Sequence, residues 1–306
     1  MIRKPTLAII GAGKVGSVLA ILLQKKNYPV VGVASRSLDS AKKLAKVIHC
    51  PVYEKAQELS KQAELIFITT PDREIGRTAK TIAEQGGFRS GQVVAHTSGA
   101  HAAHELRGVQ EAGALAVSIH PLQSFADIKG ALKNLPGSYF ALEGAKEALP
   151  LAKQVVGDLG GKAFIISAQD KPLYHAAACI VSNYLVSLMY FATGLYQHFG
   201  LSRKEAFQAL FPLIQGTINN ISRVGPVQSL TGPVSRGDGA TIKDHLPALR
   251  RVGREELNLY RTLGLYTVRI GLEKGSINRA QAAQLEKIFT EVVSKDIQSY
   301  QRAIFG

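Results

Sequence analysis

Residues 6–26 have the sequence "TLAIIGAGKVGSVLAILLQKK". Its first part, Leu7 to Ile10, is a short apolar run with the composition of a buried strand. A G-x-G-x-x-G pattern follows at residues 11–16, and apolar residues then recur at helical spacing. A strand, a glycine turn and a helix in this order predict the phosphate-binding turn of a dinucleotide site. The alternative is a glycine turn that binds no ligand.

Each glycine of the pattern has its own purpose in such a turn. Gly11 permits the tight bend, Gly13 lets the backbone approach a pyrophosphate, and Gly16 lets the helix pack closely on the strand. The pyrophosphate then accepts hydrogen bonds from the free N–H groups at the start of the helix. We therefore assign cofactor binding to all six residues of the turn: Gly11, Ala12, Gly13, Lys14, Val15 and Gly16.

The end of the second predicted strand, residues 30–34, indicates which cofactor is bound. An NAD site places an acidic side chain here to accept the ribose 2′-hydroxyl, but this chain has Ser35, Arg36 and Ser37. Hydroxyls and a guanidinium suit a 2′-phosphate instead. The sequence therefore predicts NADP(H) bound by these three residues, with a solvated loop charge as the alternative for Arg36.

The N-terminal half continues as strands that alternate with helices, a pattern that predicts a parallel, doubly wound sheet. The further predicted strands are 51–53, 64–69, 92–95, 114–119, 139–142 and 163–166. From about residue 170 the periodicity is helical, with long helices over 173–195 and 203–222, the second kinked at Pro212, and further helices from about 240, 247 and 278. The predicted fold class is α/β, with a Rossmann-type domain over 1–167 followed by an all-α domain over 168–306.

Composition and charge narrow the classes of function. Among 306 residues the net charge is +14, but the basic residues are spread over both halves and form pairs rather than clusters. This pattern favours attraction of an anionic cofactor and a small anionic substrate over nucleic-acid binding. Two cysteines, with no C-x-x-C or His/Cys cluster, predict no disulfide framework and no metal site.

Localisation and assembly also follow from composition. The N-terminal apolar run is too short for a signal peptide, and no continuous stretch approaches the about 20 apolar residues of a membrane span. We therefore expect a cytoplasmic protein without a membrane partner. The broad apolar face of residues 173–195 is too hydrophobic for one small domain to cover, which predicts a homodimer.

Further candidate residues follow the predicted strands, at the sheet edge where open α/β sheets bind ligands. Thr70 and Pro71 end the strand 64–69 and are assigned to the cofactor. Ser98, in the loop after strand 92–95, is assigned to both cofactor and substrate, with a turn serine as the alternative. Three nearby histidines lack partnering carboxylates and are interpreted as surface residues: His96, His101 and His104.

Four motifs, together with the nucleotide turn, carry a resemblance that spans the chain. They are "HTSGA" at 96–100, "IHPLQSF" at 119–125, "KPLYHAAACIVSNYL" at 171–185 and "LTGPVSRGDGATIKDHL" at 230–246. With these motifs the chain resembles a family of oxidoreductases that pair a Rossmann-like domain with a helical C-terminal domain of unknown function. The family lies in the 6-phosphogluconate-dehydrogenase-like group, with ketopantoate, β-hydroxyacid, pyrroline-5-carboxylate and prephenate enzymes. The resemblance implies NADP-dependent oxidation or reduction of a small molecule.

The resemblance also implies catalytic candidates. In β-hydroxyacid dehydrogenases and ketopantoate reductases, a Lys opens the inter-domain helix and an Asn follows four residues later. Lys171 matches the Lys, but His175 stands at the fourth position, so either group could transfer the proton. Asn183 lies about 80° round a regular helix from His175. His120 resembles the histidine near the substrate of prephenate dehydrogenases. The alternative for His175 is a core or capping histidine.

The glycine-rich loop 225–239 is the strongest signal in the second half. Arg236 within it would suit a substrate carboxylate through two-pronged pairing, so Ser98, His120 and Arg236 are the substrate-binding candidates. The alternative is a loop that only connects helices. Asp238 is expected to cap the next helix, and Asn278 with Gln281 resembles a capping box.

Three functions remain open. The leading one is an NADP-dependent reductase of a small keto or imino acid, similar to ketopantoate reductase, with Lys171 or His175 as proton donor. The second is an oxidative enzyme similar to prephenate dehydrogenase, with His120 or His175 as base. The third is a non-catalytic NADP(H)-binding sensor or scaffold.

Overall fold

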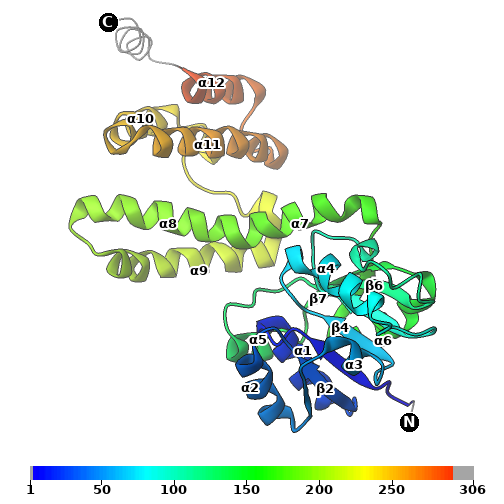
Figure 1. Ribbon diagram of the computed structural model, residues 1–306. Coiled ribbons are helices and arrows are strands. Elements are labelled where there is room, and N and C mark those ends of the chain that lie inside the picture. Colours follow the sequence, from blue (N-terminus) through cyan, green and yellow to red (C-terminus); the bar gives the residue numbers. More distant parts are fainter. Residues whose placement is uncertain (1–2, 292–306) are drawn as a thin grey trace, which may run out of the picture. The chain divides into compact units, whose positions relative to one another are not determined.

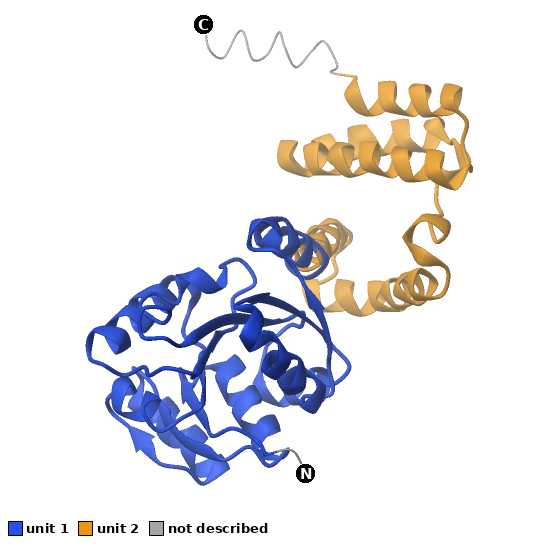
Figure 2. Cartoon of the chain, turned by 90° about the vertical axis from the view of Figure 1, so that its right-hand side faces the viewer, with its two compact units in different colours: residues 1–184 blue, residues 185–306 orange. Residues whose placement is uncertain are grey.

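The computed structural model describes residues 3–291 and divides the chain into two compact units, Met1–Tyr184 and Leu185–Gly306 (Figure 2). The first unit contains the sheet and the helices that cover it, and the second is helical (Figure 1). The α/β fold class with a helical second half is confirmed. The expected domain boundary at residue 167 stays a prediction, while the division between compact units falls after Tyr184.

The first unit is built on one eight-stranded sheet in the order β3-β2-β1-β4-β5-β6-β7-β8. Its strands are β1 Leu7–Ile10, β2 Val30–Ala34, β3 Val52–Tyr53, β4 Leu65–Ile68, β5 Val93–His96, β6 Leu115–Pro121, β7 Tyr139–Gly144 and β8 Lys162–Ile165. Because β1 pairs with both β2 and β4, the strand order reverses there, and the glycine turn lies at this reversal.

Helices cover both faces of the sheet because alternate residues of each strand point to opposite faces. In β1, Leu7 and Ile9 belong to one hydrophobic core, with α1, α2, α5 and α6, while Ala8 and Ile10 belong to the other, with α3 and α4. The helices of this unit are α1 Lys14–Gln24, α2 Leu38–Ile48, α3 Ala56–Ser60, α4 Asp72–Glu84, α5 Ile128–Asn134, α6 Leu149–Asp158 and α7 Lys171–Cys179.

The sheet differs from the prediction at its far end, since β7 runs antiparallel to β6. An antiparallel neighbour needs no helical crossover to bring the chain back to the same edge, so strand–helix alternation alone does not reveal it. Strand β6 also extends beyond its predicted end at residue 119. His120 and Pro121 pair with Ala141 and Phe140 of β7, so His120 lies within a strand rather than after it.

The helix expected over 173–195 is interrupted. α7 is followed by a π-helical segment, Ile180–Tyr184, and then by α8, Leu185–Tyr196. The run Ala168–Phe199 is long and apolar enough to cross a membrane by length and composition alone, a test that helices of soluble proteins also pass. Counting continuous apolar residues missed it because polar residues are interspersed through the run.

The second unit continues with α9 Arg203–Gln228, α10 Gly239–Val252, α11 Arg254–Lys274 and α12 Arg279–Thr290. The predicted helix break at Pro247 is wrong, because α10 continues through it. Within α9 the backbone angles depart from helical values at Gly225, and not at Pro212, where the kink was predicted. Asp238 caps α10, and Asn278 and Gln281 form a capping box on α12, as expected. The core of this unit lies mainly among α10, α11 and α12.

Candidate active site

The glycine turn has the geometry that a pyrophosphate site needs. Gly11 has φ of +110°, a conformation that side chains other than glycine rarely adopt. A Cβ on Gly16 would overlap the carbonyl oxygen of Gly11 and the hydroxyl of Thr69, so α1 can approach β1 and β4 only because residue 16 is glycine. Around Gly13, by contrast, no atom lies within 4 Å of the Cβ position. This open side leaves room for a ligand against the N-terminus of α1.

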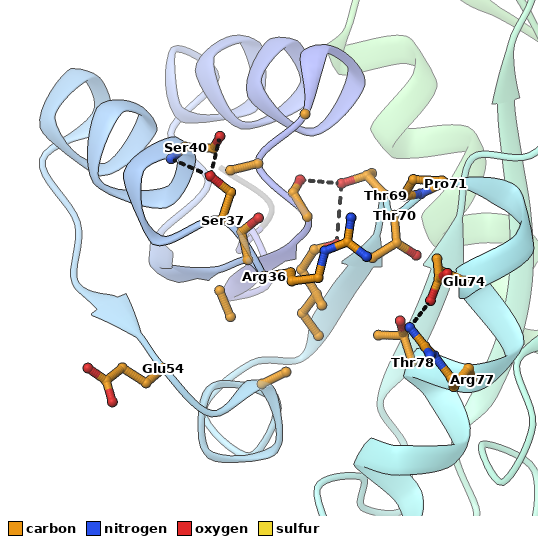
Figure 3. A pocket seen from close by; sticks show the side chains of 17 residues that line it. Arg36, Ser37, Ser40, Glu54, Thr69, Thr70, Pro71, Glu74, Arg77 and Thr78 are labelled. Carbon is orange, nitrogen blue, oxygen red and sulfur yellow. Dashed lines mark hydrogen bonds and ion pairs between the residues drawn. The ribbon is translucent and has the colours of Figure 1, made fainter.

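A cavity of about 390 Å³ adjoins this turn (Figure 3). Its lining includes eight residues that the sequence assigned to the cofactor: Gly11, Ala12, Gly13, Ser35, Arg36, Ser37, Thr70 and Pro71. Lys14, Val15, Gly16 and Ser98 do not line it. Sequence reasoning missed Ser40, Glu54, Thr69, Glu74, Arg77 and Thr78, which also line it, because they lie on neighbouring elements outside the motifs.

The polar groups of the cavity fit an anionic dinucleotide. Arg36 extends from the end of β2 toward Thr70, with the ion pair of Glu74 and Arg77 on the opposite wall (Figure 3). The hydroxyl of Thr70 is buried and has no hydrogen-bond partner within residues 3–291. A buried hydroxyl without a partner is costly, so a bound ligand that pairs with it gains affinity.

Lys171 is the most deeply buried cation of the described chain. Its side chain is fully buried, and Nζ donates to the carbonyl oxygen of Ser98 at 3.1 Å and to Oγ of Ser118 at 2.7 Å. Burial lowers the pKa of Lys171 to about 8, while the carboxylates of Glu143 and Asp72 oppose this shift. The ammonium thus joins α7 to β6 and to the loop after β5.

The hydroxyl of Ser98 forms its hydrogen bonds with other residues of the protein. Its hydroxyl donates to Oδ2 of Asp72 at 2.7 Å and accepts hydrogen bonds from the backbone N–H groups of Ala100 and His101. The residue is buried and shapes the turn, which is the alternative that the sequence left open for it.

The interpretation of His96 as a surface residue is wrong. Its ring is fully buried at the end of β5, where Nδ1 accepts from the N–H of Ser98 and Nε2 lies 3.1 Å from the carbonyl oxygen of Ala102. Burial and the nearby Lys171 lower the pKa of His96 to about 3. A neutral imidazole therefore holds the loop. His104 is exposed and His101 is partly buried.

The structure brings His120 and His175 together beside Gly99. A Cβ built on Gly99 would lie 2.6 Å from Nδ1 of His175 and 2.8 Å from Nε2 of His120. The two ring centroids are 6.0 Å apart. Nδ1 of His175 is buried without a hydrogen-bond partner in the described residues, while Nε2 lies 3.6 Å from Sγ of Cys179. Only a glycine at position 99 lets both rings approach the loop.

Two further predicted site residues have exposed side chains. Asn183 lies exposed in the π-helical segment Ile180–Tyr184, where the angular spacing of a regular α-helix does not apply. Arg236 lies exposed in the short 3₁₀-helix Val234–Arg236 of the second unit. Sequence reasoning missed Tyr174, Asp72, Ser118 and Glu143. Tyr174 lies inside the motif at 171–185. Ser118 shares a strand face with His120, so the two-residue period of a strand would have indicated Ser118.

The buried ammonium predicts a pH dependence of stability. Because the folded pKa of Lys171 lies below that of the unfolded chain, the unfolded state holds one more proton between about pH 8 and about pH 10.5. Across this window Lys171 raises the free energy of unfolding by about 1.4 kcal/mol per pH unit. We expect the free energy of unfolding of the wild type to increase relative to that of Lys171→Met as pH rises. Urea unfolding of both proteins at several pH values measures this difference. Lys153→Met, at an exposed lysine of α6, is the control. Parallel pH profiles of the wild type and Lys171→Met would contradict this assignment.

Comparisons with known proteins match this architecture. A family model for a Rossmann-like domain matches residues 2–121, and one for a domain of unknown function, DUF2520, matches residues 138–267. No curated protein matches the chain.

Solved structures share the fold over most of the chain. The candidate NADP oxidoreductase BF3122 from Bacteroides fragilis is 24% identical, with a TM-score of 0.70 over 85% of this chain and 96% of its own. Protein TM1727 from Thermotoga maritima is 28% identical, with a TM-score of 0.68 over 89% of this chain and 100% of its own. The 1-pyrroline-5-carboxylate reductase from Streptococcus pyogenes is 16% identical, with a TM-score of 0.59 over 93% of this chain and 99% of its own. The chain therefore belongs to the proteins that join a Rossmann-like domain to a DUF2520 domain, as its motifs predicted.

Proposed function

We propose that the protein is an NADP-dependent oxidoreductase that transfers a hydride between NADPH and a small keto or imino acid. The observation that carries this proposal is the pairing of two features on one sheet. A cavity suited to a dinucleotide adjoins β1, β2 and β4, and two imidazoles meet at the loop after the neighbouring β5. The names of the similar structures, an NADP oxidoreductase candidate and a pyrroline-5-carboxylate reductase, support the same class.

The residues divide into those that hold the cofactor and those that serve the substrate. The backbone of residues 11–13 would hold the pyrophosphate and Arg36 the 2′-phosphate. The bound nicotinamide would supply or accept the hydride. Lys171 is fully buried and bonded to Ser98 and Ser118, so we assign it to positioning rather than to proton transfer. His175, with its unpartnered Nδ1, is then the favoured group to transfer the proton at the substrate heteroatom.

The substrate class rests on charge and on the family. The net charge of +14 favours an anionic substrate, and Arg236 stays the candidate for its carboxylate. A reaction similar to that of ketopantoate reductase is the first choice, by analogy of fold alone. The oxidative alternative, similar to prephenate dehydrogenase, would use His120 or His175 as base. A sensor or scaffold would bind NADPH without turnover.

A substrate panel tests the function. We expect NADPH absorbance to fall with at least one member of a set of small keto and imino acids. His175→Ala should lower turnover about 100-fold or more while NADPH affinity changes little, because the imidazole contributes only to the chemical step. Reduction of NADP⁺ by a hydroxy acid alone would favour the oxidative alternative. NADPH binding without turnover in either direction would favour the sensor.

Cofactor choice is tested at Arg36. Removing a charge-assisted hydrogen bond to the 2′-phosphate costs about 1.5–3 kcal/mol, so Arg36→Ala should weaken NADPH binding about tenfold or more. NADH binding should hardly change, because NADH lacks that phosphate. Lys42→Ala removes one positive charge from the exposed face of α2 and serves as the control. Equal affinities of the wild type for NADPH and NADH would exclude the assignment.

A homodimer is the assembly that we propose. In the second unit, large apolar side chains are exposed along α8 and α9: Leu185, Val186, Tyr190, Phe207, Phe211, Leu213, Ile218, Ile221 and Val224. A patch of this kind marks an interaction surface, and a second copy of the chain can cover it. We expect a dimer in analytical ultracentrifugation. Leu213→Glu should weaken this dimer, whereas Val47→Glu, at an exposed position of α2, should not. A monomeric wild type would contradict the proposal.

A further inference from the structure

Tyr174 and His120 form a short hydrogen bond beside the candidate active site. The hydroxyl oxygen of Tyr174, in α7, lies 2.6 Å from Nδ1 of His120, in β6. The two rings meet edge to face with centroids 5.4 Å apart, and the ring of Phe164 also contacts Tyr174 edge to face, with centroids 5.9 Å apart. These contacts fix the positions of both rings relative to each other.

The hydroxyl of Tyr174 is the donor of this bond. Burial raises the pKa of Tyr174 to about 12, so the hydroxyl keeps its hydrogen at neutral pH. Within the described residues, Nδ1 of His120 is the one hydrogen-bond partner of this hydroxyl. The hydroxyl hydrogen of Tyr174 is therefore hydrogen-bonded when Tyr174 donates to Nδ1 of His120.

His120 is a neutral ring in this environment. Burial, followed by the positive charge of Lys171 and by His175, lowers the pKa of His120 to about 4. A neutral imidazole carries one hydrogen on one nitrogen. Since Nδ1 accepts from Tyr174, the hydrogen of His120 lies on Nε2.

Nε2 of His120 lies on the side of the ring where the unpartnered nitrogen of His175 is found. Both atoms are within 3 Å of the same point beside Gly99, the position that a Cβ of that residue would occupy. Nδ1 of His175 is buried and has no partner within residues 3–291. The two nitrogens thus face the same side of the turn at Gly99, one as a donor and the other without a partner.

We propose that Tyr174 is a positioning residue, which holds His120 with its hydrogen on Nε2, so that this N–H can donate to the carbonyl oxygen or imine nitrogen of the substrate. The inference rests on the proposed function and adds the role of His120. A neutral imidazole in this state polarises the substrate as a hydrogen-bond donor and does not give up its proton. Proton transfer is then left to His175. Without the Tyr174 hydroxyl, the hydrogen of His120 would distribute between Nδ1 and Nε2.

The hydrogen position can be measured directly. In protein labelled with nitrogen-15 histidine, two-bond proton–nitrogen correlation spectra distinguish a protonated from an unprotonated ring nitrogen. We expect His120 to show a protonated Nε2 and an unprotonated Nδ1, with His120→Asn used to assign its signals. His96, which accepts from the N–H of Ser98 at Nδ1, provides an internal reference for the same tautomer.

Tyr174→Phe is the test variant, and Tyr139→Phe is the matched control. Tyr139 contacts the same Phe164 ring, but its hydroxyl makes no hydrogen bond within the described part of the chain. We expect Tyr174→Phe to give a mixture of His120 tautomers and to lower kcat about tenfold, with KM for NADPH unchanged. Tyr139→Phe should leave the tautomer and kcat as in the wild type.

Two results would overturn the proposal. One is a wild-type His120 with its hydrogen on Nδ1, a result that does not depend on the folding of any variant. The other is a His120 tautomer that Tyr174→Phe leaves unchanged in a folded protein. Both are read without cofactor or substrate, so they are independent of the proposed function. Failure of turnover with every keto and imino acid would instead reject the proposed function, while the tautomer measurement still decides the role of Tyr174.

Discussion

The buried ammonium of Lys171 is the interaction on which the arrangement of the candidate site depends. An unpaired charge in the protein interior is very costly, so it requires the carbonyl oxygen of Ser98 and the hydroxyl of Ser118 as partners. Those partners belong to the loop after β5 and to β6, and Lys171 itself opens α7. One side chain therefore sets the position of the first turns of α7, which carry Tyr174 and His175, against the edge of the sheet.

Burial and the same charge together determine the protonation of the neighbouring histidines. Together with burial, this charge lowers the pKa values of both His96 and His120, and these rings are neutral at physiological pH. His96 uses its neutral state to hold the backbone of the loop. His120 uses it to accept from Tyr174 on one nitrogen and present a donor on the other. A cation that transfers no proton thus helps to keep both rings neutral, and their hydrogen-bond partners then determine which nitrogen carries the hydrogen.

Local signals in the sequence predicted the parts of the structure that depend on local physics. The glycine turn was predictable because Gly11 and Gly16 are required by backbone geometry, and the helix caps at Asp238 and Asn278 because capping acts over three residues. The antiparallel β7, the buried His96 and the Tyr174–His120 bond were not, since each depends on pairing between segments distant in sequence. Residue spacing in a regular helix also failed for Asn183, because the π-helical segment changes the angle per residue.

Asp72 and Ser98 connect the cavity at the glycine turn to the turn that contains Gly99. Thr70 and Pro71 line the cavity, and the next residue, Asp72, begins α4 and accepts from the hydroxyl of Ser98. That hydroxyl also accepts two N–H groups of the turn that contains Gly99. The cavity wall at Thr70 is therefore joined, through Asp72 at the start of α4 and through Ser98, to the turn against which both histidines pack. Because β4, β5 and β6 are neighbours in the sheet, the cavity wall at Thr70, the turn at Gly99 and His120 lie on adjacent strands or shortly after them.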